Sequence, residues 1–220
     1  IKLSIMKSKN LTFKSPREIS LIIWKNIFYE SKNLNLEIEH NKYFKLLNKQ
    51  DKSFTYNLIS MCIRRNVEIK NIYSKHLNKK IVNHQKYLTS ILMLSTTEIY
   101  LLRTPNYAVL NDYVELTRTL VGKYYTGFIN AILRKVINNK HINKISDEDF
   151  YLNIPKFMFS NWIKSYGKST TKSITKEIIK KPYVDIICSK KITVIQKSKL
   201  IADIKGMEIY PNVIRSFHKG

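Results

Sequence analysis

The chain of 220 residues is 44% hydrophobic and 11% aromatic, which is typical of a folded protein with a substantial core. No apolar run approaches the roughly 18 residues of a membrane span, and the N-terminal residues lack an apolar signal core, so we expect a cytoplasmic protein. The net charge of +23, from 39 basic and 16 acidic residues, indicates a polyanionic partner. Charge alone leaves RNA, DNA and an anionic membrane surface open.

Cysteines and histidines give little sign of chemistry. Cys62 and Cys188 are far apart in the sequence, and without a signal peptide we expect both to be reduced and buried. The five histidines show no paired ligand spacing, which argues against a metal site.

The first predicted helix covers residues 15–30. Ser15 is suited to cap it, Pro16 to its first position, and Glu18 to completing a capping box. Apolar residues three and four positions apart then predict a run of helices up to about residue 140, with no strand. After residue 30 these helices cover residues 41–48, a segment capped by Asp51 and ending near Arg65, and residues 67–77, 84–102, 107–121 and 124–138.

The character of the chain changes after residue 140. A polar linker precedes two short helices at 154–167 and 168–181, a strand at 183–189, a helix at 193–206 and an extended segment at 207–217. We therefore predict a mainly α protein in three parts. These are a flexible basic N-terminus (1–14), an all-α helical domain (15–140), and a helical connector that opens a small α/β subdomain (141–220).

One segment resembles a known family. "TTEIYLLRTPNYAVLNDYVELTRTLVGKYYTGFINAILRKV" is similar to the helical domain that the NusB transcription factor shares with Sun-type rRNA cytosine-5 methyltransferases. The shared pattern is a long apolar helix, a loop with proline, a Val-Glu pair and "GF-x-N-x-x-LR". It falls on Pro105, Val114 with Glu115, and then Gly127, Phe128, Asn130, Leu133 and Arg134.

The remainder of the chain is similar to the connector of the methyltransferases, which leads into a small RNA-binding subdomain that NusB lacks. The methyltransferase branch is therefore the better match. Two features depart from the family pattern. Lys52 stands where an arginine is usual, and Phe159 stands near a usual leucine.

The resemblance implies a structural role for the Gly-Phe-x-Asn motif. Gly127 would allow its helix to approach a neighbour closely, because glycine has no Cβ. Asn130 would use its amide to bind backbone groups of the loop at Thr104 to Asn106. Arg134 would either touch phosphate or pair with Glu115, and we favour the internal pair.

The resemblance also implies methyl transfer from S-adenosylmethionine, by a cysteine nucleophile that this chain does not supply. None of its five glycines forms a cofactor loop, and neither cysteine matches the catalytic motif. We predict no catalytic residue and no cofactor within these residues. The catalytic domain would follow Gly220, and the chain would be a C-terminally incomplete fragment.

Binding to RNA, 16S rRNA in particular, is what the resemblance leaves for this chain. Phosphate contacts are expected from basic residues of the first helix and nearby segments, and Tyr29 or Tyr73 is available to stack on unpaired bases. The predicted RNA-binding residues are Lys14, Arg17, Lys25, Arg64, Arg65 and Arg134.

Two other interpretations remain. One is a free-standing NusB-like antitermination factor that binds RNA and a ribosomal protein, although the residues after about 140 argue against it. Binding to an anionic membrane rests on charge alone.

Overall fold

A computed structural model describes residues 14–78, 81, 86–102, 104–139, 149–180 and 182–216. The chain divides into two compact units, residues 1–179 and residues 180–220. The predicted boundary lay near residue 140, about forty residues before the division between these units. Of the predicted N-terminal segment, only Lys14 lies within the described residues.

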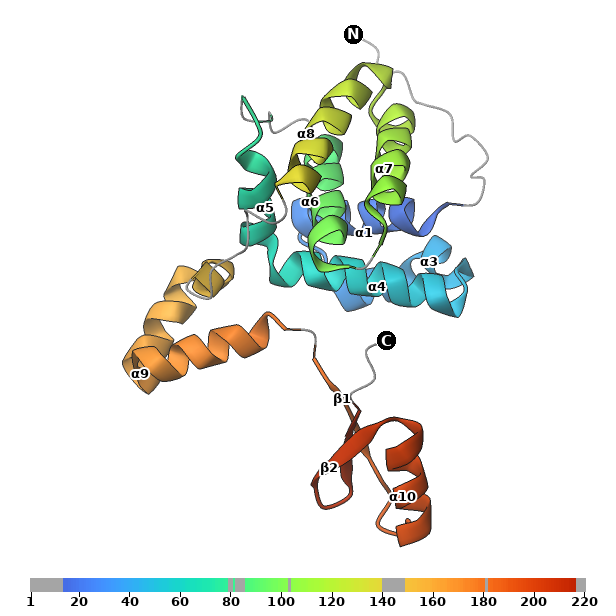
Figure 1. Ribbon diagram of the computed structural model, residues 1–220, viewed down its shortest axis with the longest axis vertical. Helices are drawn as coiled ribbons and strands as arrows, with labels where there is room; N and C mark the ends of the chain where they lie inside the picture. Colours follow the sequence, from blue (N-terminus) through green and yellow to red (C-terminus); the bar gives the residue numbers. More distant parts are fainter. Residues whose placement is uncertain are drawn as a thin grey trace. The chain divides into compact units, whose positions relative to one another are not determined.

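The first unit is helical (Figure 1). In its described residues it contains no strand, as the sequence predicts. Its elements are α1 Pro16–Glu30, α2 Leu34–His40, α3 Lys42–Leu46, α4 Lys49–Arg64, α5 Asn66–Ser74, α6 Lys86–Leu101, α7 Asn106–Leu120, the 3-10 helix η1 Lys123–Tyr125, α8 Thr126–Asn138, the 3-10 helix η2 Asp149–Asn153 and α9 Lys156–Ile178.

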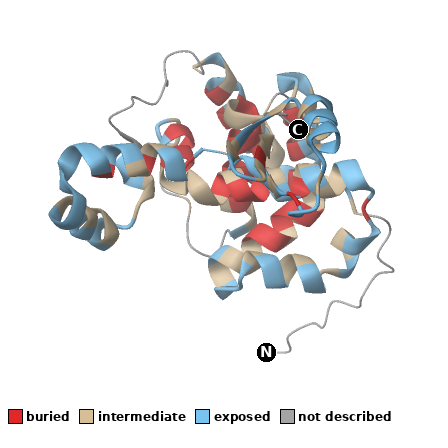
Figure 2. Ribbon diagram, turned by 90° about the horizontal axis from the view of Figure 1, so that it is seen from below, coloured by how far each residue is buried: buried red, intermediate tan, exposed pale blue. Residues whose placement is uncertain are grey.

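Helix α6 is the centre of the core. It contacts α1, α4, α5, α7 and α8, and every residue from Ser90 to Ile99 is buried. Its buried residues are apolar or small and hydroxyl-bearing, except for Glu98, so the helix has no strongly polar side and its sequence favours this central place. The buried residues of the surrounding helices gather inside the helical body (Figure 2).

Local sequence sets the helix ends. The Ser15 hydroxyl accepts a hydrogen bond from the Glu18 N–H at 3.2 Å, but the Glu18 carboxylate pairs with Lys14, so the predicted capping box forms only in part. Helix α4 begins earlier than predicted because Asn48 caps it. The Asn48 side-chain Oδ1 accepts from the Asp51 N–H at 2.8 Å, which places Asp51 in the first turn.

Helix α2 was not predicted; its cap, Asn33, accepts from the N–H groups of Asn35 and Leu36. Helix α9 contains the two short helices that the sequence predicts. Gly167, whose φ is 78°, is non-helical and separates them at the predicted junction.

The second unit is an antiparallel sheet with one helix. Strand β1 Val184–Ile187 is followed by α10 Val194–Asp203, β2 Gly206–Tyr210 and β3 Val213–Ser216, and the strand order is β1-β3-β2. The single extended segment predicted at 207–217 is a hairpin of two strands. Asn212, with a φ of 62°, makes the turn that the sequence reading missed.

Candidate nucleic-acid interface

The predicted basic residues of α1 are bound to acidic partners. Arg17 donates to both carboxylate oxygens of the buried Glu98 and, at 2.6 Å, to Asp112. Lys14 pairs with Glu18, and the Lys25 ammonium lies 3.3 Å from a carboxylate oxygen of Glu30. Arg17 therefore links α1 to α6 and α7. Its guanidinium is already hydrogen-bonded to carboxylates and is not free to bind phosphate.

The two arginines at the end of α4 differ. Arg65 donates through Nε to Glu68 at 2.6 Å, and Glu68 also contacts Asn153 of η2. Burial raises the pKa of Glu68, and the adjacent guanidinium of Arg65 opposes that shift. Arg64 is half-buried, and no ion pair is found for it among the described residues. Arg65 is thus part of an internal network.

Neither predicted stacking tyrosine is well placed to bind a base. Tyr73 is buried in the core, and burial raises the pKa of its hydroxyl. Tyr29 is half-buried, and the Lys86 ammonium lies 5.2 Å from the centre of its ring.

The packing role predicted for Gly127 is wrong in this structure. A Cβ built on Gly127 would meet nothing within 4 Å, and the residue is exposed. The role predicted for Asn130 is wrong as well. Its side-chain Oδ1 accepts from the Arg134 Nε at 3.3 Å, and within the described residues no hydrogen bond joins it to the loop at Thr104 to Asn106. Pro105 in that loop is the N-cap of α7.

The internal pair predicted between Arg134 and Glu115 is also wrong. Glu115 pairs with Arg118 one turn along α7, at 3.0 Å. Arg134 extends along its own helix to Asn130 and is exposed. Glu115 and Arg118 are three residues apart in the same helix. Their ion pair therefore forms within α7 and does not link α7 to α8, as the predicted pair would have done.

The exposed side of α8 is distinct from the core side. The buried residues Ile129, Ile132, Leu133 and Val136 follow the helical repeat. The opposite side, which we call the α8 outer face, consists of Gly127, Phe128, Ala131, Arg134, Lys135 and Asn138.

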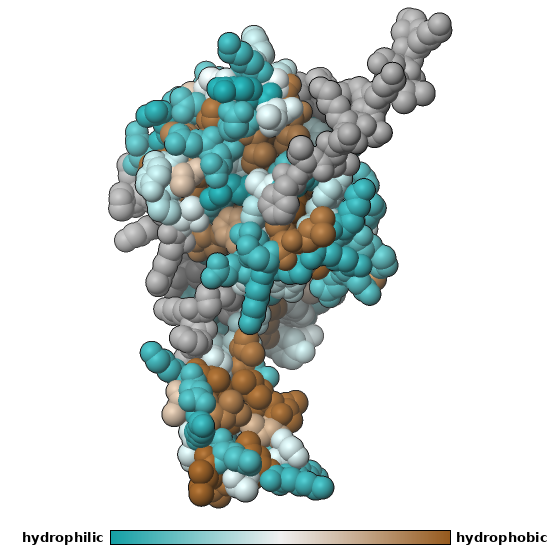
Figure 3. All heavy atoms as spheres, turned by 90° about the vertical axis from the view of Figure 1, so that its right-hand side faces the viewer, coloured by the Kyte–Doolittle hydropathy of each residue, from teal (hydrophilic) through white to brown (hydrophobic). Residues whose placement is uncertain are grey.

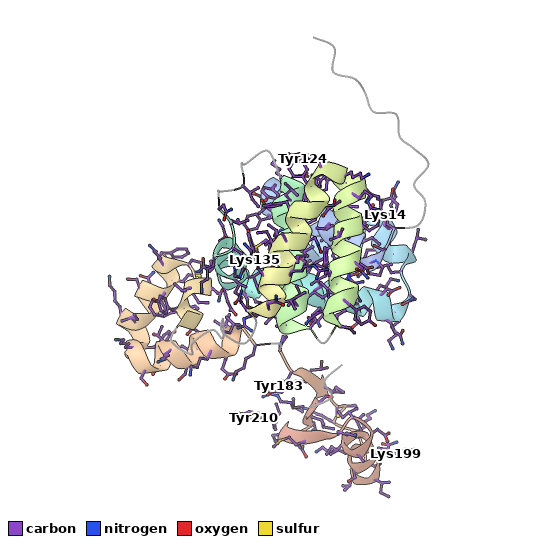
Figure 4. The ribbon with its side chains drawn as sticks, turned by 45° about the horizontal axis from the view of Figure 1, so that its top comes forward. Lys14, Tyr124, Lys135, Tyr183, Lys199 and Tyr210 are labelled. Atoms are coloured by element: carbon purple, nitrogen blue, oxygen red, sulfur yellow. The ribbon has the colours of Figure 1, made fainter. Side chains whose placement is uncertain are left out.

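An aromatic corner lies next to the α8 outer face, in η1. Tyr124 is 89% exposed, and its ring meets that of Tyr125 edge-on with 5.1 Å between centroids. Tyr124 stands at the end of the helical body, and Lys135 lies further along α8 (Figure 4). Exposed rings and basic side chains are the groups that bind unpaired bases and phosphates, and here they come from two consecutive helices, η1 and α8.

The charged residues of the α8 outer face, Arg134 and Lys135, are both basic. The chain has no acidic residue between Glu115 and Asp147, and no side chain caps the start of α8. Positive helix N-termini attract anions. The pKa of the nearby His76 lies below its ordinary value because of burial and because of the charges of Lys135 and Lys75.

Sequence reasoning missed Lys123, Tyr124 and Lys135, and read Phe128 only as part of a packing motif. The signal was present in the helical repeat, which puts residues 127, 128, 131, 134 and 135 opposite the apolar stripe. The absence of acidic residues from the same stretch is a second signal.

The fold defines an all-α helical domain built around one buried helix, followed by a small α/β unit. Residues 14–138 match the NusB family, and the chain belongs to that family. It is 32% identical over 112 residues to the transcription antitermination protein NusB of Buchnera aphidicola subsp. Cinara cedri (strain Cc), covering 50% of this chain and 75% of that protein.

A solved structure extends the likeness beyond the helical domain. The crystal structure of PH0851 matches 96% of this chain with a TM-score of 0.58 at 13% sequence identity. The chain spans about half of that protein, 51% of its length. The likeness concerns the fold, and it includes residues outside the NusB match.

None of the described helices is both long and apolar enough to cross a membrane. The described residues also contain no group of three His, Cys, Asp or Glu side chains arranged to hold a metal ion.

Proposed function

We propose that this chain binds RNA through the α8 outer face and the neighbouring η1 corner. The observation that carries the proposal is that exposed rings, Tyr124 and Phe128, and exposed basic side chains, Arg134 and Lys135, come from one stretch of chain, residues 116–146, that contains no acidic residue. Rings stack on unpaired bases, and basic side chains neutralise the adjacent phosphates.

The role that we propose for this binding is rRNA recognition, 16S rRNA in particular, by a cytoplasmic S-adenosylmethionine-dependent cytosine-5 methyltransferase. Two observations support it. The chain continues past the NusB match into an α/β unit, and a protein of about twice this length shares the fold over almost the whole chain. The cofactor and the catalytic cysteines would be supplied by residues outside these 220.

The second candidate is antitermination, as an RNA-binding partner of a ribosomal protein. The observation in its favour is the 32% identity to a protein named as transcription antitermination protein NusB. Capture of a ribosomal protein by the purified chain, with no stimulation of cytosine methylation in a reconstituted reaction, would favour this candidate.

RNA binding is tested by fluorescence anisotropy with a labelled single-stranded fragment of 16S rRNA. Double-stranded DNA of matched charge serves as competitor. We expect the substitution Tyr124→Ala to weaken binding at least about fivefold, because loss of one base-stacking ring costs about 1–3 kcal/mol. Lys135→Ala should reduce the slope of log affinity against log salt concentration by about one, the value for one lost phosphate contact.

The matched control is Lys164→Ala, which removes the same charge from an exposed position of α9. Equal losses for Lys135→Ala and Lys164→Ala would show that binding follows total charge and not this surface. Equal affinity for RNA and the DNA competitor would contradict the proposal.

A further inference from the structure

Helix α5 begins without a cap from its own end of the chain. Arg65 occupies the N-cap position, and its side chain, which carries donors but no acceptor, makes no capping hydrogen bond. The N–H group of Glu68 lies in the first turn of α5, where backbone N–H groups have no acceptor within the helix. Local sequence therefore leaves this end of α5 unsatisfied.

The cap comes from a residue that follows 85 positions later in the chain. At the end of η2, the Asn153 Oδ1 accepts a hydrogen bond from the Glu68 N–H at 3.2 Å. The Asn153 Nδ2 donates to the Glu68 Oε2 at 3.3 Å. One amide group thus binds both the backbone and the side chain of Glu68, which fixes the orientation of η2 on α5 as well as its position.

Glu68 is a residue that needs these partners. It is 4% exposed, and a buried carboxylate is costly unless it is paired and hydrogen-bonded. The Arg65 Nε donates to the same Oε2 at 2.6 Å, and the Arg65 Nη2 donates to Oε1. We call Arg65, Glu68 and Asn153 the α5 latch.

The latch acts on α9 through η2. The rings of Tyr151 in η2 and Phe159 in α9 are stacked, with 5.2 Å between their centroids. The Ile154 N–H donates to the Tyr151 carbonyl oxygen at 3.0 Å, which closes the short turn between the two helices. The position of η2 therefore sets the position of the first half of α9, up to the break at Gly167.

The latch joins a residue inside the NusB match to one outside it. Glu68 lies within residues 14–138, and Asn153 belongs to the connector that follows. That connector leads to the second unit, on whose surface apolar side chains gather (Figure 3). Ile187 is 81% exposed there and Ile195 82%. A connector that is fixed at its base limits the volume that such a surface can reach.

We propose that the α5 latch is a conformational device that holds the connector on the helical domain. While Asn153 caps α5, η2 and the first half of α9 stay on the helical domain, and loss of the cap releases them together. Asn153 is a positioning residue in this device. Loss of one cap shifts an equilibrium about twofold to thirtyfold, so a single side chain is enough to change the population of the released state.

The first measurement is amide hydrogen exchange of the full chain and of the variant Asn153→Ala, followed by mass spectrometry. We expect peptides of η2 and of the first half of α9 to exchange at least about fivefold faster in the variant. Peptides of α6 should exchange as before, because the core of the helical domain does not depend on the connector.

The second measurement follows the position of α9 directly, by electron–electron resonance between two spin labels. The labels are attached at Asn111→Cys in α7 and Ser160→Cys in α9, two exposed positions, while Cys62 and Cys188 are buried. We expect one narrow distance distribution in the parent and at least about a twofold broader one with Asn153→Ala. A cap that served α5 alone would not change this distance.

Two further variants separate the latch from ordinary capping. Asn153→Asp keeps a good capping residue, but it places a second carboxylate where Nδ2 now donates to Glu68. At neutral pH we expect it to release the connector as Asn153→Ala does. Asn161→Ala makes the same truncation at an exposed position of α9 and should change neither exchange nor distance.

The outcomes decide between a latch and a local cap. Faster exchange confined to α5, with an unchanged distance distribution, would overturn the inference. Full retention of the connector by Asn153→Asp would reduce the contact to a cap and would also overturn it. Faster exchange in α6 would mean that the whole helical unit loosens, against the proposal. None of these measurements involves RNA, so the proposed function is tested separately.

Discussion

Arg17 and Glu98 form a buried ion pair at the residue scale, and each depends on the other. Glu98 is fully buried in α6, while the Arg17 side chain retains 18% of its exposure. Removing the guanidinium would leave a carboxylate without compensation in the core, which is far costlier than losing a surface contact. Arg17 was predicted to touch RNA, but its geometry makes it first a structural residue.

We expect Arg17→Met to lower the free energy of unfolding by about 3–5 kcal/mol, measured by urea denaturation. The control is Asp112→Asn, whose carboxylate is 51% exposed, and it should cost less than about 1 kcal/mol. The double variant Arg17→Met/Glu98→Met should recover most of the loss. A small effect of Arg17→Met alone would contradict the structural role.

His76 offers a second prediction at this scale. Burial and the charges of Lys135 and Lys75 lower its pKa below 6.5, so the folded chain binds the proton less readily than the unfolded chain. The stability that His76 contributes is therefore present above pH 6.5 and is lost as the pH falls from there through the lowered pKa.

A phosphate bound at Lys135 would oppose the charge that lowers the pKa of His76. We expect RNA to raise that pKa, and RNA affinity to increase as the pH falls below 6.5, because binding then takes up a proton. A histidine C2-proton NMR titration with and without RNA measures the shift. The variant Lys135→Ala should raise the pKa in the free chain. An unchanged pKa on RNA binding would place the phosphates elsewhere.

At the scale of elements, α8 combines poor helix residues with a strongly apolar inner side. Among the described residues, no neighbouring helix packs closely against Gly127, because a Cβ built there would meet no atom within 4 Å. A glycine that costs helix stability and packs against nothing is consistent with a surface kept bare for a ligand.

We expect Gly127→Ala to raise the free energy of unfolding by about 0.5–1 kcal/mol, because the position is helical and free of clashes. The same variant should bind RNA more weakly, since its methyl group lies on the α8 outer face. Thermal unfolding and anisotropy on one preparation measure both effects. Destabilisation by Gly127→Ala would restore the packing interpretation.

The sequence predicted elements well and side-chain partners poorly. Helix α6 follows from the three- and four-residue spacing of its apolar residues, and the break at Gly167 lies where two short helices were expected. Partners such as Glu98 for Arg17 are 81 residues away, and no local pattern specifies them. The β2–β3 hairpin was missed because a Pro-Asn turn is a weaker signal than Asn-Gly.

At the scale of the whole molecule, the two units differ in how much core they have. The helical unit buries most of the apolar residues, whereas in the described part of the second unit only Cys188 and Ile214 are buried apolar residues. Small units with little buried surface are marginally stable. The second unit should therefore be the more sensitive to a change in its sheet.

Gly206→Ala tests this difference. A Cβ at Gly206 would lie 2.6 Å from the Arg215 carbonyl oxygen, a backbone atom that can move only if the strands separate. We expect amide hydrogen exchange in β3 to increase at least tenfold, while α6 stays protected. Equal loss of protection in α6 would show that the units unfold as one.

The internal pairing of Arg17, Arg65, Lys14 and Lys25 has a kinetic consequence. The pairs cancel charge locally but leave the net charge of +23, so the chain will meet many polyanions at high, salt-sensitive association rates. The association rate then does not discriminate between one polyanion and another. Selection has to come from residence time, which the rings of η1 would set through slow dissociation of the preferred RNA.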